Sequence, residues 1–323
     1  MPQLNRQFSV APMMDWTNRH CRYFHRLLSP HALLYTEMVT TGALIHGDKA
    51  RFLAFDGFEQ PVALQLGGSN PADMAACAEF AEAAGYQEVN INVGCPSDRV
   101  QNGKIGACLM SEPALVAQCV VAMREKVDIP ITVKTRIGID DFDSLDFLLG
   151  FVRAVSNAGC ETVIIHARKA VLSGLSPKEN RTIPPLNYER AYEVKKEFPH
   201  LNIVVNGGIK DVRDIKDHWG KLDGVMIGRE AYHNPFFLAE VEHQLFNQPL
   251  LDREMVLRRF IPYVEEQLSL GVPLQRMSKH ILGLFAGQPG GKHWRRYLSE
   301  SVRPKHSGAD LLLAAYDEMK LYQ

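Results

Sequence analysis

The chain has 323 residues, a length that fits one architecture of about 250 residues with a smaller appendage. Its 36 Lys and Arg nearly balance its 37 Asp and Glu, for a formal net charge of −1, which excludes a field over the whole chain that attracts nucleic acid or anionic lipid. Any binding site for a polyanion must therefore be local.

Cysteine usage and hydropathy narrow the class of protein further. The six cysteines show no C-x-x-C pair, which gives no sign of a metal site, and no pattern typical of a small disulfide-stapled scaffold. The amino terminus lacks a charged-then-apolar leader, and no apolar stretch approaches the roughly 20 residues that span a bilayer. We therefore expect reduced thiols in a cytoplasmic protein.

Short apolar runs rich in β-branched residues recur about every 20 to 40 residues, with segments of helical periodicity between them. Eight such runs lie near residues 8–11, 33–37, 62–66, 88–92, 131–134, 162–166, 202–206 and 224–227. Apolar residues three and four apart, as in helices that pack on a sheet, occur in segments 71–84, 113–126, 144–158 and 188–197. Eight alternations of strand and helix predict a closed (β/α)8 TIM barrel.

The βα rhythm stops after about residue 245. Helical patterning continues in 253–270, 274–285 and 294–302, and the run of glycines and proline over 287–291 predicts a turn between helices. We therefore predict a barrel domain over 1–243 and a small all-helical C-terminal domain over 244–323.

The carboxyl-terminal ends of the predicted strands are unusually polar, and this is the rim at which barrel enzymes build their active sites. In chain order the strand ends carry Pro12-Met13-Met14, Glu37-Met38, Gln65, Asn92 with Cys95, Lys134, His166-Ala167-Arg168, Asn206-Gly207-Gly208 and Gly228-Arg229. One polar strand end is more often a satisfied structural group. So many polar ends in register predict a functional site.

Two of these strand ends lie where such barrels commonly bind phosphate. Asn206-Gly207-Gly208-Ile209 follows the seventh strand, and Gly228-Arg229 follows the eighth. Glycines there let backbone N–H groups approach phosphate oxygens, and Arg229 adds a fixed charge. The alternative is a pair of ordinary tight turns, but their joint position favours a ligand that carries phosphate.

Lys134 ends the fifth predicted strand, across the barrel mouth from that phosphate, a separation that suits flavin mononucleotide (FMN) better than a small sugar phosphate. A cation there stabilises negative charge on the N1/O2 edge of a reduced flavin. Gln65 offers amide hydrogen bonds to the pyrimidine edge of the ring, and the backbone over 11–13 can line its flat face. A surface lysine is the alternative for Lys134, but the preceding apolar run 131–133 directs its side chain to the rim.

Cys95 follows the fourth predicted strand, in a turn that contains Gly94 and Pro96. Cysteine thiols ordinarily titrate near pH 8.5, so they are mostly protonated near neutrality, which suits a general acid better than a nucleophile. Reduction of a carbon–carbon double bond by a flavin requires such a proton donor, and Asn92 and His166 can fix a planar ring against the flavin. The alternative for Cys95 is a small buried core residue.

Several of these segments carry a family resemblance. The sequences over 11–17 (APMMDWT), 35–38 (YTEM), 92–97 (NVGCPS), 206–209 (NGGI) and 228–229 resemble those of the tRNA-dihydrouridine synthases, over nearly the whole chain. The block over 94–97 is highly specific. The segments over 175–181, 183–186 and 294–299 are similar to the branch that acts on D-loop nucleotides 20 and 20a.

The resemblance implies an enzyme that reduces uridine in tRNA to 5,6-dihydrouridine. It implies hydride transfer from FMN N5 to uridine C6, a proton from Cys95 to C5, contact of Asn92 with the target base, and NADPH as the reductant. The first domain is then the FMN-binding catalytic domain and the second the tRNA-binding domain. The residues implied to bind FMN are Pro12, Met13, Met14, Gln65, Lys134, His166, Asn206, Gly207, Gly208, Gly228 and Arg229.

A uridine in folded tRNA must be turned out of its stack to reach a flavin in a barrel, so affinity must come from the RNA backbone. Positive charge is concentrated over 292–306, in Lys292, Arg295, Arg296, Arg303 and Lys305 against the single acid Glu300. A helix there would bury Trp294, Tyr297, Leu298 and Val302 and direct Arg295, Arg296 and Ser299 outward, toward phosphates. The alternative is a solvated helix face. The resemblance also marks Lys178 and Arg181, after the sixth strand, as RNA-contacting.

Two other functions fit part of the pattern. A flavin-dependent reductase or dehydrogenase of a free pyrimidine shares the barrel, the phosphate site and the cysteine acid, but it gives no role to a basic helical tail. A non-catalytic RNA-binding module leaves the polar rim and Cys95 unexplained. No dinucleotide fingerprint marks an NADPH site. We expect a monomer that binds tRNA and no membrane.

Overall fold

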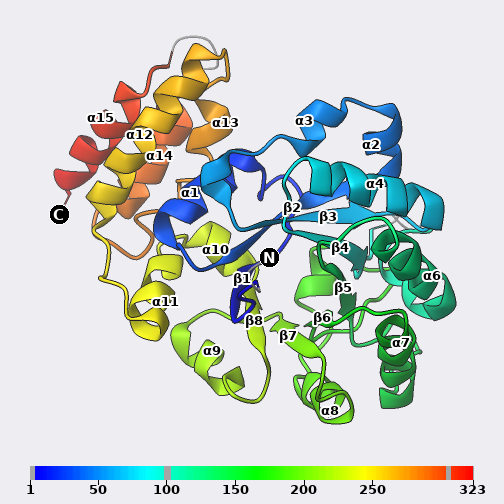
Figure 1. The fold of residues 1–323 in the computed structure, drawn as a ribbon. Helices are drawn as coiled ribbons and strands as arrows, with labels where there is room; N and C mark the ends of the chain where they lie inside the picture. Colours follow the sequence, from blue (N-terminus) through cyan, green and yellow to red (C-terminus); the bar gives the residue numbers. More distant parts are fainter. Residues whose placement is uncertain (1–3, 98–102, 303–306, 323) are drawn as a thin grey trace. The chain divides into compact units, whose positions relative to one another are not determined.

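The computed structural model describes residues 4–97, 103–302 and 307–322 and confirms the predicted (β/α)8 barrel (Figure 1). Each strand pairs in parallel with the next, and β1 closes the barrel on β8. The strands are β1 (Phe8–Val10), β2 (Leu33–Thr40), β3 (Val62–Gly67), β4 (Glu88–Val93), β5 (Ile131–Arg136), β6 (Thr162–His166), β7 (Asn202–Asn206) and β8 (Gly224–Ile227). The fifth strand thus continues beyond its predicted end, to Arg136.

Helices alternate with the strands. The four predicted segments form α4 (Pro71–Ala83), α6 (Pro113–Arg124), α7 (Leu145–Asn157) and α8 (Glu189–Glu197). Helix α9 (Val212–His218) follows β7, and the short helices α2 (Thr41–His46) and α3 (Lys49–Leu53) follow β2. Side-chain caps fix where several of these helices begin, because the capping side chains satisfy N–H groups that lack a partner in the helix. The Asn70 side chain accepts from the N–H groups of Ala72 and Asp73, and Ser144 caps α7 at Phe147.

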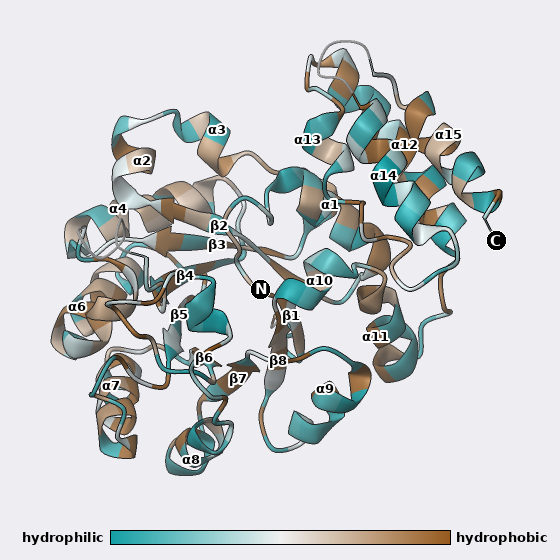
Figure 2. Cartoon of the chain, turned by 180° about the vertical axis from the view of Figure 1, so that it is seen from behind, coloured by the Kyte–Doolittle hydropathy of each residue, from teal (hydrophilic) through white to brown (hydrophobic). Residues whose placement is uncertain are grey.

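The barrel interior has an apolar side and a polar side. Its apolar cluster consists of Ala11, Leu33, Tyr35, Ala63, Ile164, Val204 and Met226. The inward positions of β4 and β5 instead carry Glu88, Asn90 and Thr132, all buried. In Figure 2 strand β7 is mostly brown and helices α8 and α9 are mostly teal, as expected for a buried strand surrounded by helices with solvated faces.

The chain divides into two compact units. The first comprises 1–14, 32–55 and 60–228, and the second comprises 15–31, 56–59 and 229–323. The second unit therefore contains α1 (Arg19–Leu28), α10 (Arg229–His233) and α11 (Phe237–Phe246) in addition to the C-terminal helices. The domain boundary between 243 and 244 stays a prediction.

The C-terminal helices of the second unit are α12 (Arg253–Ser269), α13 (Gln275–Ser278), α14 (Gly291–Ser301) and α15 (Asp310–Lys320). The predicted helix over 274–285 is largely wrong, because α13 ends at Ser278 and tight turns follow. Gly283 lies within these turns, and only glycine fits there, since a Cβ on it would lie 2.3 Å from the carbonyl oxygen of His233. The predicted turn is confirmed: Gly290 has a φ of 72° and precedes the first residue of α14.

No helix in the described part of the chain combines the length and the apolar character needed to cross a bilayer. All six cysteines are described, and each is a free thiol.

Candidate active site

Hydrogen bonds to backbone groups hold the Cys95 loop in place. The Asn92 side-chain oxygen accepts hydrogen bonds from the N–H groups of Gly94 (3.1 Å) and Cys95 (3.0 Å). The Cys95 carbonyl accepts from the N–H of Ala107 (2.9 Å), where the 3-10 helix η2 (Gly106–Ser111) begins. These bonds hold the backbone of Cys95 on both sides while the residue stays partly exposed, as a proton donor requires.

Lys134 and Asn206, both predicted site residues, are brought together across the barrel. The Lys134 ammonium donates to the Asn206 side-chain oxygen (3.1 Å), and the Asn206 amide donates to the Met226 carbonyl (2.8 Å). Burial, and to a smaller extent the positive charge of Arg136, lower the pKa of Lys134 to about 7, and Cys95 opposes the shift. A bound anion beside Lys134 would restore its charged form.

His166, Gly207 and Gly208 form a close-packed corner after β6 and β7. A Cβ on Gly207 would lie 2.6 Å from His166 Cδ2, and one on Gly208 would lie 2.6 Å from the Tyr188 hydroxyl. Both glycines have positive φ, 110° and 79°, and the Tyr188 hydroxyl donates to the Gly207 carbonyl (2.7 Å). The backbone shape and the close contacts therefore both require glycine here.

Gln65 and Asn92 bind each other inside the barrel. The Asn92 amide donates to Gln65 Oε1 (2.8 Å), and the Gln65 amide donates to Asn90 Oδ1 (2.8 Å). Gln65 is 1% exposed. Each amide group has a second N–H, so these bonds leave donors for a ligand.

The other predicted FMN ligands lie at the ends of β1 and β8. Met13 packs against the apolar barrel cluster, whereas Met14 is exposed, and Pro12 is partly buried. A Cβ on Gly228 would meet its nearest side-chain atom only at 4.0 Å, so there is open space beside this backbone. Arg229 is the first residue of α10 and belongs to the second unit.

Arg136 is a buried site residue that the sequence analysis missed. Its Nε donates to the Gly94 carbonyl (3.0 Å), and its Nη1 donates to the carbonyls of Asn180 (2.9 Å) and Lys169 (3.2 Å). It therefore ties the Cys95 loop to the loop after β6. Burial lowers the pKa of Arg136 to about 10. Alternation along β5 was the available signal, because Arg136 lies two residues after Lys134 on the same side.

The loop after β6 presents its two predicted RNA contacts to solvent. Lys178 and Arg181 are exposed around the 3-10 helix η3 (Glu179–Arg181). Asn180 between them is fully buried and holds the loop, since its amide donates to the carbonyls of Val171 (2.9 Å) and Leu175 (3.1 Å). Their contact with RNA stays a prediction.

Helix α14 has the predicted outward basic face. Arg295 and Arg296 are exposed, whereas Trp294 and Leu298 are buried. The indole N–H of Trp294 donates to the Ile281 carbonyl (3.1 Å), which fixes the rotation of the helix. The predicted basic residues Arg303 and Lys305 lie outside the described residues.

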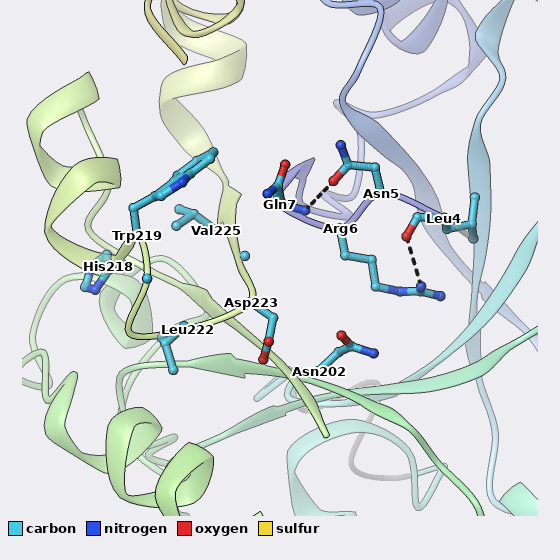
Figure 3. A pocket seen from close by; sticks show the side chains of 12 residues that line it. Leu4, Asn5, Arg6, Gln7, Asn202, His218, Trp219, Leu222, Asp223 and Val225 are labelled. Carbon is cyan, nitrogen blue, oxygen red and sulfur yellow. Dashed lines mark hydrogen bonds between the residues drawn. The ribbon is translucent and has the colours of Figure 1, made fainter. Parts of the chain in front are cut away.

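A cavity of about 610 Å³ opens at the other end of the barrel (Figure 3). Arg6, Asn202, Trp219 and Asp223 are among the residues that line it, near the amino-terminal ends of β7 and β8. The predicted site residues do not line it. Barrel enzymes place their chemistry at the carboxyl-terminal rim, so we assign the site to the Cys95 end. Within the described residues, no cluster of His, Cys, Asp or Glu could hold a metal ion.

A closed (β/α)8 barrel with cationic, amide and thiol groups at its carboxyl-terminal rim has the construction of a barrel enzyme. A family profile described as "Dihydrouridine synthase (Dus)" matches residues 9–320, and the chain belongs to this family of enzymes. The predicted family is therefore confirmed.

Several proteins are similar to this chain over most of its length. A protein of Vibrio vulnificus (strain CMCP6) is 60% identical over 312 residues, 96% of this chain and 95% of that protein. One from Vibrio cholerae is 60% identical over 309 residues (95% and 94%), and one from Escherichia coli (strain K12) is 60% identical over 308 residues (94% and 88%). Each of these relatives is named tRNA-dihydrouridine(20/20a) synthase.

Proposed function

We propose that the protein reduces the C5=C6 bond of uridine at positions 20 and 20a of the tRNA D-loop. The supporting observation is that relatives named for this reaction are 60% identical over almost the whole chain, which includes the barrel and the helical tail. The polar rim and the fixed Cys95 loop agree with such chemistry.

The residues at the rim fit FMN as the cofactor. In the described part of the chain, the hydrogen-bond acceptor of Lys134 is the neutral amide of Asn206, and no carboxylate contributes to its pKa. A partly buried cation without a paired anion favours a ligand that develops negative charge. The backbone at Gly207 and Gly208 and the open space beside Gly228 suit a phosphate.

Bound FMN would supply a hydride from N5 to uridine C6, and NADPH would reduce the flavin. Lys134 favours negative charge on the flavin ring, and the Cys95 thiol gives a proton to C5. Asn92 contacts the target base, and His166 contributes with the other predicted FMN-binding residues, Pro12, Met13, Met14, Gln65, Asn206, Gly207, Gly208, Gly228 and Arg229. Anion stabilisation and proton donation thus come from different side chains.

Exposed cations supply the contacts to tRNA in this proposal. Arg295 and Arg296 on α14, and Lys178 and Arg181 in the loop after β6, bind phosphates. The chain as a whole carries a net charge of −1, so these local groups must provide the attraction. The proposal further places the protein in the cytoplasm as a monomer.

The test is to incubate the purified protein and NADPH with tRNA that lacks modifications, and to map dihydrouridine by position. We expect a yellow protein that modifies positions 20 and 20a, and a Cys95→Ala variant that retains flavin but forms little product. Equal product from that variant would remove Cys95 from its role. Activity on free uracil but not on tRNA would favour the free-pyrimidine reductase, and a colourless protein unable to bind flavin would favour a non-catalytic RNA binder.

A further inference from the structure

A continuous chain of hydrogen bonds leads from the Cys95 loop into the barrel. The N–H of Cys95 donates to Asn92 Oδ1 (3.0 Å), and Asn92 Nδ2 donates to Gln65 Oε1 (2.8 Å). Gln65 Nε2 donates to Asn90 Oδ1 (2.8 Å), and Asn90 Nδ2 donates to Thr132 Oγ1 (2.9 Å). We call Asn92, Gln65, Asn90, Thr132 and Glu88 the amide relay.

The amide relay ends on a buried carboxylate. Thr132 Oγ1 donates to Glu88 Oε1 (2.7 Å), and Arg6 donates to Glu88 Oε2 through Nη2 (2.6 Å) and Nε (3.1 Å). The Tyr35 hydroxyl also donates to Glu88 Oε1 (2.6 Å). Burial raises the pKa of Tyr35 well above its ordinary value, which keeps this hydroxyl a donor. Glu88 thus accepts from every partner.

Strand alternation explains how the amide relay is built. Glu88, Asn90 and Asn92 are two residues apart on β4, so they point to the same side, and Asn90 lies beside Gln65 on β3 and Thr132 on β5. Glu88 and Asn90 are fully buried, and Thr132 is 1% exposed. Such polar groups are costly in a core unless each is paired, and here each is paired with the next.

Every bond of the amide relay runs in the same direction, toward Glu88. An ionised carboxylate can only accept, so it orients the Thr132 hydroxyl, which in turn orients each amide up to Asn92. The Asn92 oxygen is thereby turned toward the N–H of Cys95. A reversed Asn92 amide would place an N–H against that N–H and release the loop.

We propose that Glu88, Thr132 and Asn90 are positioning residues that act through Gln65 and Asn92 to hold the proton donor Cys95 in place. This inference rests on the proposed function, in which Cys95 protonates uridine C5. None of the three needs to touch the substrate or cofactor. They act from the interior of the barrel, and the Arg6 partner of Glu88 lines the cavity at its far end (Figure 3).

Thr132 offers the sharpest test, because its hydroxyl and its volume can be changed separately. Thr132→Val keeps the volume and removes the hydroxyl, whereas Thr132→Ser keeps the hydroxyl and removes a methyl group. We expect Thr132→Val to lower kcat for dihydrouridine formation about tenfold with an unchanged KM for tRNA. Thr132→Ser should stay within about twofold of the unaltered protein. Thr162→Val is the matched control, a buried threonine at the start of β6 outside the amide relay.

A second measurement monitors the backbone N–H of Cys95 by NMR and does not depend on enzyme activity. In protein labelled with ¹⁵N-cysteine, Cys95→Ala assigns the Cys95 signal, and Thr132→Val should shift that signal and increase its hydrogen exchange about tenfold. Thr132→Ser and Thr162→Val should leave it in place. An unshifted Cys95 signal with an unchanged kcat in Thr132→Val would overturn the amide relay, as would equal impairment by Thr132→Ser. If the unaltered protein forms no dihydrouridine, the proposed function fails, whereas the amide signal still decides the relay.

Discussion

The corner after β7 gives a prediction whose size follows from the contacts. Gly208 has a φ of 79° and lies in the predicted phosphate cradle, and Gly220 has a φ of 80° in a site where a Cβ meets nothing within 4 Å. Gly208→Ala and Gly220→Ala therefore impose the same φ on alanine, but only the first also forces a close contact. The comparison separates backbone strain from packing.

The expected magnitudes differ between the two variants. A left-handed backbone costs a non-glycine residue roughly 1 to 2 kcal/mol, which is the whole expected loss for Gly220→Ala. A Cβ on Gly208 would lie 2.5 Å from Leu186 Cδ1 and 2.6 Å from the Tyr188 hydroxyl, and overpacking of this kind typically costs about 1 to 3 kcal/mol more. We therefore expect Gly208→Ala to lose about 2 to 5 kcal/mol of unfolding free energy.

Urea unfolding of both variants, with and without Tyr188→Phe, measures the cost of the strained backbone and the cost of the close contact separately. Tyr188→Phe removes the oxygen that the new methyl group meets, so it should reduce the extra cost of Gly208→Ala by about 1 kcal/mol and leave Gly220→Ala unchanged. Flavin absorbance of the purified proteins should fall for Gly208→Ala and not for Gly220→Ala. Equal losses at the two glycines, or no coupling to Tyr188, would refute the reasoning.

Three further predictions concern charged residues. Replacement of both Arg295 and Arg296 by Ala should weaken tRNA binding and reduce its log–log salt slope by about two, with flavin content intact; an unchanged salt series contradicts the assignment. The pKa of Lys134 is lowered to about 7, so between that pH and the roughly 10.4 of an unfolded lysine the unfolded chain binds more protons. Stability of the apoprotein should therefore rise with pH from about 7 to about 10, and thermal unfolding of Lys134→Met across pH should show this rise flattened. Arg136→Met removes the hydrogen bonds that the guanidinium donates to the carbonyls of Gly94 and Asn180, so trypsin should cut the loop after β6 faster. An unchanged cleavage rate would show that Arg136 does not hold this loop.

The eight strands could be predicted because each is a short apolar run with its own turn signals. The rim residues followed from the same pattern, since a residue that ends a parallel strand lies at the rim whatever its neighbours are. Asn92, Lys134, His166 and Asn206 were all placed in this way, and each ends or nearly ends its strand in the structure.

Other features depend on contacts that a single sequence does not contain. The segment 274–285 has helical spacing, but after Ser278 it forms tight turns, in which Gly283 lies so close to the His233 backbone that only glycine fits. The hydrogen bonds from Gln65 to Asn90 and from Asn90 to Thr132 depend on the register of β3, β4 and β5. A slip of one residue would turn all these side chains to the other face. The register of the strands must therefore be known before these hydrogen bonds can be predicted.

The uneven interior of the barrel links these observations to the chemistry. On β6, β7 and β8 the inward side chains in the layer just below the rim are apolar, Ile164, Val204 and Met226, and they belong to the packed core. On β4 and β5 the inward positions remain polar from the bottom of the barrel to the rim, where they end in Asn92, Lys134 and Arg136. An apolar core beneath Asn92 would leave its amide free to rotate, whereas the bonded amides beneath it fix one orientation. The polar strands are thus those that lead to the proposed proton donor Cys95 and carry Lys134 and Arg136, which need the most exact placement, and the apolar strands supply the stability.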